Sequence, residues 1–341
     1  MSDLVDYKKH GAVGVITINN PPVNALSPGV PEGIYVSLQQ GMKDDDVKAM
    51  VLIGGGRSFI AGADIKHVGE KKSPIAMKWR DEMEMMDKPV VAAIHGFALG
   101  GGLESALCAH YRVAVPSAKV GLPEVLIGIL PGGGGTQRIP RLVGPKKALD
   151  LIVTGRHVQA PEAKDLGIID ELAPEGDLLN AAVAYAEKIA DIRPLPRVGE
   201  RAEKLQEAKD DPGIFDAMRK KIARKARNQV APYNCIKCVE AACSMPLREG
   251  LARERELFDE IREGDETKAL KYAFFAEREA TKIPDVPRDT PVTKIESAAV
   301  IGAGTMGGGI AMCFANVGIP VKLLEVNQEA LDLIVTGRHV P

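Results

Sequence analysis

The chain has 341 residues, a formal net charge of −2 and an isoelectric point near 6.4, with 45% hydrophobic and 26% charged residues. This is the composition of a globular enzyme with one large domain and a smaller one, or two of ordinary size. The near-neutral charge argues against a nucleic-acid-binding protein, which usually has a basic domain. Aromatic residues make up only 4% of the chain, which disfavours stacking on bases. We therefore expect no nucleic-acid partner.

The N-terminal residues 1–6 (MSDLVD) have neither the basic start nor the apolar core of a signal peptide. No apolar run in the chain approaches the ~18 residues that span a bilayer. We expect an intracellular protein without a membrane partner, cytoplasmic or, as the alternative, peroxisomal.

Strand-like and helix-like segments alternate over residues 1–195, which predicts an α/β layered domain. The strand signals are short β-branched runs closed by turn residues, at 11–18, 49–53, 89–94 and 111–115. The clearest helical stretches between them are 31–42 and 72–87.

The pattern changes after residue 195. Residues 196–282 are rich in Ala, Glu, Lys and Arg at helical spacing, with 267–280 as an amphipathic helix. Residues 283–296 contain closely spaced prolines and are typical of a semi-extended linker. A buried-strand candidate at 298–301 and a second strand at 321–325 then enclose a helical stretch, in a unit that we delimit as 297–329.

An eleven-residue segment occurs twice without change, at 148–158 and at 330–340 (ALDLIVTGRHV). A single distant copy fits no repeat architecture. We interpret residues 330–341 as a tail without function, of the kind a splice or a misassembled coding sequence would produce.

Five cysteines are irregularly spaced, which is not the pattern of a disulfide framework. Cys235 and Cys238 form a C-x-x-C pair, but no second pair or histidine pair follows at ligand spacing. We expect two helix cysteines and no metal site.

Four motifs of the first domain carry chemical groups: 58–66 (SFIAGADIK), 94–104 (IHGFALGGGLE), 120–124 (VGLPE) and 130–138 (LPGGGGTQR). Adding water across an α,β-unsaturated thioester needs a base for the water and an acid for Cα, which two carboxyl groups in different environments can supply. The thioester oxygen becomes an enolate, which backbone N–H groups at a glycine-rich helix start can stabilise. Gly100–Gly102 and the small-residue turn Ala61–Ala63 fit that requirement.

Each motif also has a plainer explanation when it is taken alone. Glu104 could be a first-turn helix carboxylate favoured by the helix dipole. Glu124 could be a solvated loop acid, and Gly132–Gly135 a flexible loop. For His95, near the site in sequence, we prefer a structural role.

Taken together and in this order, the motifs resemble those of the enoyl-CoA hydratase/isomerase (crotonase) family. The family's AGADIK turn corresponds to Ala61–Lys66 and its GGG-x-E helix start to Gly100–Glu104. Its G-x-PE segment corresponds to Gly121–Glu124 and its PG-x-GGTQR loop to Pro131–Arg138. The resemblance covers roughly residues 10–190 and implies a crotonase-type spiral of ββα units for residues 1–195.

The resemblance also implies roles for individual residues. Glu104 would position and activate the water, while Glu124 would deliver the proton to Cα and shuttle a proton in 3-enoyl to 2-enoyl isomerisation. Ala63 and Gly101 would supply the oxyanion-hole N–H groups. Ala61, Ala63 and Lys66 would bind coenzyme A. Hydration would need no cofactor, and the substrate would be an acyl-CoA.

The second half of the chain is similar to multifunctional β-oxidation enzymes, in which a hydratase/isomerase is fused to a 3-hydroxyacyl-CoA dehydrogenase. Residues 20–25 (NPPVNA) and 272–277 (YAFFAE) carry this likeness. Gly302, Gly304 and Gly307 follow a strand and open a helix, and Glu325 ends the next strand, about where a ribose-binding acid belongs. This predicts the start of an NAD-binding domain, an incomplete Rossmann βαβ unit that we do not expect to form a competent NAD site.

The sequence thus predicts an enoyl-CoA hydratase of fatty-acid β-oxidation with an accompanying isomerase activity. The dehydrogenase's catalytic groups are not expected within this chain, so we predict no dehydrogenase activity. The alternatives are a 3-hydroxyacyl-CoA dehydrogenase, a non-catalytic acyl-CoA-binding fragment, and a thioester hydrolase or pure isomerase of the same superfamily. Either a monomer or a trimer-based oligomer is compatible with the resemblance.

Overall fold

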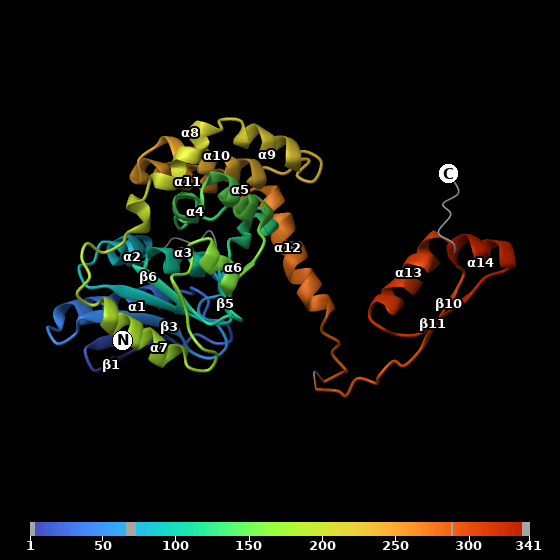
Figure 1. Cartoon of the computed structure of the whole chain (residues 1–341), viewed down its shortest axis with the longest axis horizontal. Helices are drawn as coiled ribbons and strands as arrows, with labels where there is room; N and C mark the ends of the chain where they lie inside the picture. The colour runs from blue at the N-terminus through green and yellow to red at the C-terminus, as the bar shows by residue number, and fades with distance from the viewer. Residues whose placement is uncertain (1–3, 66–72, 288, 336–341) are drawn as a thin grey trace. The chain divides into compact units, whose positions relative to one another are not determined.

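The computed structural model describes residues 4–65, 73–287 and 289–335. The chain divides into two compact units, residues 1–278 and 279–341 (Figure 1). Within the described ranges, no helix is long and apolar enough to cross a membrane.

The first unit is built on a six-stranded sheet with the strand order β1-β2-β3-β4-β6-β9. β1 and β2 are antiparallel and the remaining neighbours are parallel. Every residue of β3 and β4 is buried, as expected for parallel strands that are covered on both faces. The strands are β1 (Val5–His10), β2 (Val13–Ile18), β3 (Ala49–Gly54), β4 (Val90–Ile94), β6 (Tyr111–Ala114) and β9 (Glu171–Leu172).

A second sheet has three strands, and a buried helix begins directly after one of them. It consists of β5 (Phe97–Leu99), β7 (Lys119–Gly121) and β8 (Val158–Gln159). β5 and β7 run parallel with Leu99 opposite Gly121, and the Gly100 N–H donates to the Gly121 carbonyl at 2.8 Å. Because both strands end at the same edge, the helix after β5 and the 3-10 helix after β7 begin side by side.

The helices of residues 1–195 connect these strands, and α1 and α7 pack against the large sheet (Figure 1). They include α3, whose eight residues are all buried, and the 3-10 helix η2. Their bounds are α1 (Val30–Lys43), α2 (Pro74–Glu84), α3 (Gly101–Cys108), η2 (Pro123–Ile127), α4 (Gly135–Val143), α5 (Pro145–Thr154), α6 (Ala160–Asp165) and α7 (Leu178–Ile189).

Residues 196–280 are mainly helical, as predicted, and this region packs onto the first domain through α10. α10 packs against α4, α5 and α11. The elements are η3 (Val198–Glu200), η4 (Glu203–Leu205), α8 (Gln206–Asp210), α9 (Ile214–Ile222), α10 (Ala231–Ser244), α11 (Leu247–Ile261) and α12 (Asp265–Ala280).

The second unit contains one β-α-β arrangement followed by a helix. β10 (Ala298–Ile301) and β11 (Val321–Leu324) pair in parallel, with α13 (Thr305–Asn316) between them in the chain and α14 (Gln328–Val335) after them. The parallel βαβ unit expected at 297–329 is therefore present. The two copies of the repeated segment both begin in a helix, α5 and α14; residues 336–341 lie outside the described part of the chain.

Candidate active site

A cavity of about 340 Å³ brings together four of the residues that the sequence singled out. Ala63, Gly101, Glu104 and Glu124 all line it. α11 contributes a further part of the wall through Arg255, Phe258 and Asp259, and Arg262 directly after the helix adds to it. The helical segment 196–282 therefore contributes to the cavity wall and also links the first domain to the second unit in sequence.

The Ala63 and Gly101 backbones lie next to each other. A Cβ atom built on Gly101 would be 3.4 Å from the Ala63 nitrogen. Gly101 is the first residue of α3, and among the described residues neither N–H group donates to a backbone carbonyl. Two neighbouring donors, one of them at a helix N-terminus, are an arrangement that could stabilise an oxyanion.

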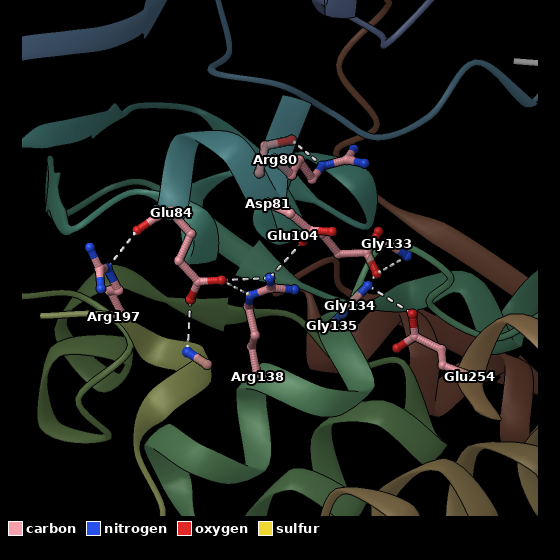
Figure 2. Close-up of polar contacts among 12 residues, drawn as sticks. Arg80, Asp81, Glu84, Glu104, Gly133, Gly134, Gly135, Arg138, Arg197 and Glu254 are labelled. Atoms are coloured by element: carbon pink, nitrogen blue, oxygen red, sulfur yellow. Dashed lines mark hydrogen bonds and ion pairs between the residues drawn. The ribbon is translucent and has the colours of Figure 1, made fainter. Parts of the chain in front are cut away.

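Glu104 is buried in the first turn of α3 and is held by the glycine-rich loop before α4. Its Oε1 accepts hydrogen bonds from the Gly133 N–H at 2.7 Å and the Gly135 N–H at 2.9 Å (Figure 2). No room is left for a side chain at residue 133, because a Cβ there would lie 2.4 Å from Glu104 Oε2. One carboxylate oxygen is therefore fixed by two donors, and the other remains available to a ligand.

Glu124 enters the cavity from η2, whose position is set by the small sheet. Among the described residues, its Oε2 has no hydrogen-bond partner. Burial, reinforced by the negative charge of Glu104, holds the pKa of Glu124 well above the usual range. Glu124 is therefore a half-buried group poised to carry a proton, which contradicts the explanation of it as a solvated loop acid.

A third carboxyl group, that of Glu254 on α11, lies on the other side of the same glycine-rich loop. The side chain is 2% exposed, and it accepts hydrogen bonds from the Gly134 N–H at 2.8 Å and the Thr136 N–H at 3.2 Å. Burial and the charge of Glu104 raise the pKa of Glu254 to about 8. Glu104 and Glu254 thus bind the same short loop, and the charge of Glu104 affects the pKa of Glu254.

Arg80 of α2 places a positive charge beside these groups. Its Nε donates to Ser105 Oγ at 3.0 Å and its Nη2 to the Gly101 carbonyl at 3.2 Å. The positive charge of Arg80 partly offsets the factors that raise the pKa of Glu124. Arg80 therefore joins α2 to the N-terminal turn of α3 while moderating the negative charge of the cavity.

A buried ion pair fixes α4 against α2. Arg138 Nη2 donates to Glu84 Oε2 at 2.6 Å, and the other Glu84 oxygen accepts from the Gly199 N–H at 2.7 Å (Figure 2). Asp81 adds a second contact to the same guanidinium at 3.1 Å. Because Arg138 follows the glycine-rich loop directly, this pair anchors the C-terminal side of that loop.

Other residues named from the sequence lie around the site or outside it. The Ala61 N–H donates to the Val23 carbonyl at 3.1 Å, and Ala61 is not among the residues lining the cavity. Lys66 lies outside the described residues. His95 Nε2 is 3.0 Å from the Gly56 carbonyl oxygen, which agrees with a structural role.

Cys235 and Cys238 are buried on α10, and no cluster that could hold a metal ion occurs among the described residues. Burial raises the pKa of both thiols.

Sequence reasoning did not identify Arg80, Glu254 or the α11 residues of the cavity wall. Glu254 did leave a signal, because the buried residues of α11 (Gly250, Glu254, Leu257 and Ile261) recur at helical spacing and one of them is charged. Arg80 has no comparable signature.

In the second unit, the residues of the predicted nucleotide site come together. The Ala303 N–H donates to Glu325 Oε2 at 2.5 Å, so the acid at the end of β11 lies against the glycine-rich turn. A Cβ on Gly307 would collide with the Gly302 carbonyl, whereas Cβ atoms on Gly302 and Gly304 would meet none of the described atoms within 4 Å. The turn is thus close-packed on the helix side and open on the side where a pyrophosphate would approach, which fits the dinucleotide fingerprint.

Solved structures similar to this chain have the crotonase fold. A carnitinyl-CoA dehydratase from Mycobacterium avium is 31% identical, with a TM-score of 0.58, over 80% of this chain and 96% of that protein. An enoyl-CoA hydratase from Bacillus anthracis is 28% identical, with a TM-score of 0.52, over 81% of this chain and 97% of that protein. The expected crotonase-type architecture, followed by a helical region, is therefore confirmed.

Residues 8–200 match the model of the enoyl-CoA hydratase/isomerase family, and residues 297–337 match that of the 3-hydroxyacyl-CoA dehydrogenase NAD binding domain. The first match covers more than half of the chain, so this protein belongs to the enoyl-CoA hydratase/isomerase family.

Curated relatives are named as bifunctional or multifunctional enzymes. A peroxisomal bifunctional enzyme from Cavia porcellus is 41% identical over 94% of this chain and 45% of its own length. A glyoxysomal fatty acid beta-oxidation multifunctional protein from Brassica napus is 39% identical over 94% of this chain and 46% of its own length. The chain therefore spans a little under half the length of these relatives.

Proposed function

We propose that this protein hydrates 2-enoyl-CoA thioesters in fatty-acid β-oxidation, with Glu104 and Glu124 as its acid–base pair. The observation that carries the proposal is that both carboxyl groups line one cavity together with Ala63 and Gly101. Their environments differ, because Glu104 accepts two backbone hydrogen bonds while Glu124 has a strongly raised pKa. A hydration reaction requires one carboxyl group that accepts a proton and one that donates it, which two different environments can supply.

In the proposed reaction, Glu104 accepts a proton from water as the water oxygen bonds to Cβ of the enoyl group. The electron pair of the double bond moves toward the thioester, and the resulting enolate oxygen is bound by the Ala63 and Gly101 N–H groups. Protonated Glu124 then donates its proton to Cα. The proton accepted by Glu104 returns to Glu124 through solvent or product before the next turnover.

Binding of coenzyme A would involve Ala61, Ala63 and Lys66, as the family resemblance implies. The position of Ala63 on the cavity wall supports this assignment for one of the three. Hydration requires no cofactor, because both proton transfers are performed by side chains.

Isomerisation of 3-enoyl to 2-enoyl thioesters would use Glu124 alone, which removes one proton and returns it at another carbon. The raised pKa of Glu124, caused by burial and the Glu104 charge, supports such a shuttle because it makes the carboxylate a stronger base than an exposed one.

In the second unit, Gly302, Gly304, Gly307 and Glu325 would hold part of an NAD molecule, which when bound supplies a hydride acceptor. The described residues of this unit provide a single β-α-β arrangement. The absence of dehydrogenase activity stays a prediction, to be checked by NADH formation from a 3-hydroxyacyl-CoA.

The names of the relatives favour a β-oxidation role and the peroxisomal alternative over the cytoplasmic expectation. A monomer or a trimer-based oligomer remains the expected assembly.

The test is hydration of crotonyl-CoA, measured as loss of the conjugated thioester absorbance. We expect Glu104→Gln and Glu124→Gln each to lower kcat by roughly 10²- to 10⁴-fold. Glu249→Gln, at an exposed position of α11, is the matched control and should retain full activity.

A folded wild type that binds an acyl-CoA without hydrating it would refute the proposal in favour of a binding fragment. NADH formation without hydration would favour the dehydrogenase instead.

A further inference from the structure

The backbone of residues 133–136 is a strip whose successive N–H groups serve two different carboxyl groups. The Gly133 and Gly135 N–H groups donate to Glu104, at 2.7 and 2.9 Å. The Gly134 and Thr136 N–H groups donate to Glu254, at 2.8 and 3.2 Å. Figure 2 shows Glu104 and Glu254 reaching this backbone from different sides. The two side chains therefore share one short segment of main chain.

The strip has little room to change shape. Gly134 has φ +95°, and a Cβ atom there would lie 2.0 Å from Arg138 Nη1. Cβ atoms on Gly133 and Gly135 would lie 2.4 and 3.0 Å from the Glu104 carboxylate oxygens. Glycine is thus required where the strip meets the Glu104 carboxylate and the Arg138 guanidinium.

The helix that carries Glu254 is closely docked at this point. A Cβ atom on Gly250, one turn before Glu254, would lie 2.1 Å from Gln137 Oε1. The Gln137 Nε2 group donates both to Thr136 Oγ1 and to the Cys238 carbonyl of α10, each at 2.9 Å. Thr136 Oγ1 in turn donates to Glu254 Oε2 at 2.5 Å. α10, α11 and the strip are therefore linked by one continuous set of buried hydrogen bonds.

We propose that Glu254 is a positioning residue for hydration, which acts through the 133–136 strip to hold Glu104. The inference rests on the proposed role of Glu104. Glu254 is not among the residues that line the cavity, so we assign it an indirect role. Glu254 provides the acceptors for the Gly134 and Thr136 N–H groups. It thereby fixes the orientation of the strip, so that the Gly133 and Gly135 N–H groups point at Glu104 Oε1.

The consequence of losing Glu254 follows from the burial of the strip. Gly134 and Thr136 are buried, so N–H groups without an acceptor would be costly and the backbone would rotate to find others. Rotation of one peptide group turns its neighbours, which would loosen the hold on Glu104. The helical segment 196–282 would then be part of the catalytic apparatus of this chain.

The test compares Glu254→Ala and Glu254→Gln with Glu256→Gln, at an exposed position of the same helix. Ala removes both acceptor oxygens, and we expect kcat for crotonyl-CoA hydration to fall on the order of 10²-fold, with KM changed less than about threefold. Gln keeps one acceptor oxygen and should lose about tenfold. Glu256→Gln should match the wild type. Equal kcat for the wild type and both Glu254 variants would overturn the inference while leaving the hydratase proposal intact.

A double-mutant cycle separates positioning from a general loss of structure. If Glu254 acts through Glu104, then Glu254→Gln should cost less than about twofold in the Glu104→Gln background. If the loss of kcat in the double variant equals the product of the two single-variant losses, the inference is overturned. Hydrogen exchange of the peptide covering residues 130–140 should be faster in Glu254→Gln than in Glu256→Gln, and unchanged exchange would contradict the anchoring role. An inert wild type would overturn both the hydratase proposal and this inference.

Discussion

The carboxyl group of Glu124 lies directly against Gly100. A Cβ atom built on Gly100 would be 2.7 Å from Glu124 Oε1 and 3.1 Å from Cδ. Gly100 has φ +50° and ψ −124°, a backbone conformation that side chains disfavour. The helix start that presents the Gly101 N–H and the position of Glu124 are therefore coupled through one residue without a side chain.

The first prediction concerns that contact. Gly100→Ala should displace Glu124 and lower kcat for hydration on the order of 10²-fold, because misplacement of about 1 Å has effects of that size. The control is Gly176→Ala, which also has positive φ (+80°) but no described atom within 4 Å of the added Cβ. It should reduce stability by roughly 1–3 kcal/mol and leave kcat unchanged. Equal kcat for the two variants would contradict the prediction.

The second prediction concerns pH. In the folded protein the pKa of Glu254 is raised from 4.5 to about 8, so between these values the folded state holds a proton that the unfolded chain releases. The free energy of unfolding should therefore fall as pH rises through this window, by up to ~1.4 kcal/mol per pH unit from this group.

Glu254→Gln has no such proton, so its free energy of unfolding should vary less steeply with pH. Urea unfolding at several pH values between about 5 and 8 measures both slopes. Glu124 also has a raised pKa and contributes in the same direction, so Glu124→Gln should flatten the profile as well. Parallel profiles for the wild type and Glu254→Gln would show that Glu254 ionises normally in the folded protein.

The third prediction isolates one hydroxyl group. Thr136→Val removes the donor to Glu254 Oε2 and the acceptor of Gln137 Nε2, and should destabilise the protein by roughly 1–3 kcal/mol. It should also raise the pKa of Glu254 further, because the Thr136 hydrogen bond favours the ionised form. Thr136→Ser retains the hydroxyl and should lose less stability. Denaturant unfolding of the two variants checks the order, and a Ser variant that is the less stable would refute the explanation.

The fourth prediction compares a buried ion pair with an exposed one. Glu84→Gln leaves the Arg138 guanidinium, which is 1% exposed, without its closest carboxylate, and should cost roughly 3–5 kcal/mol of stability. Asp211→Asn breaks the ion pair with Lys146, in which the Lys146 side chain is 61% exposed and the Asp211 side chain 50% exposed. This substitution should change stability by less than ~1 kcal/mol. Thermal unfolding of both variants gives the comparison. Similar losses would mean that Asp81 compensates for the missing Glu84 charge.

Much of the fold followed from local patterns. The apolar runs at 49–53 and 89–94 became β3 and β4, which are buried on both faces, and 31–42 became α1. The first strand, Val5–His10, was not predicted, because its burial pattern has one buried residue followed by mostly exposed ones, as suits an edge strand that pairs with β2. Edge strands carry little hydrophobic periodicity, so sequence alone does not reveal them well.

The sequence by itself determined the family and identified Glu104, Glu124 and the glycine-rich turns as candidate site residues, because they lie within short motifs whose local geometry is set by glycine and by helix starts. Only the tertiary structure decided that Gly100 meets Glu124, that Arg80 stands beside α3, and that Glu254 holds the far side of the 133–136 strip. These contacts join residues between 21 and 120 positions apart. No local pattern encodes them, because they depend on how separate helices and strands pack, and a buried charge is tolerated only where that packing supplies its partners.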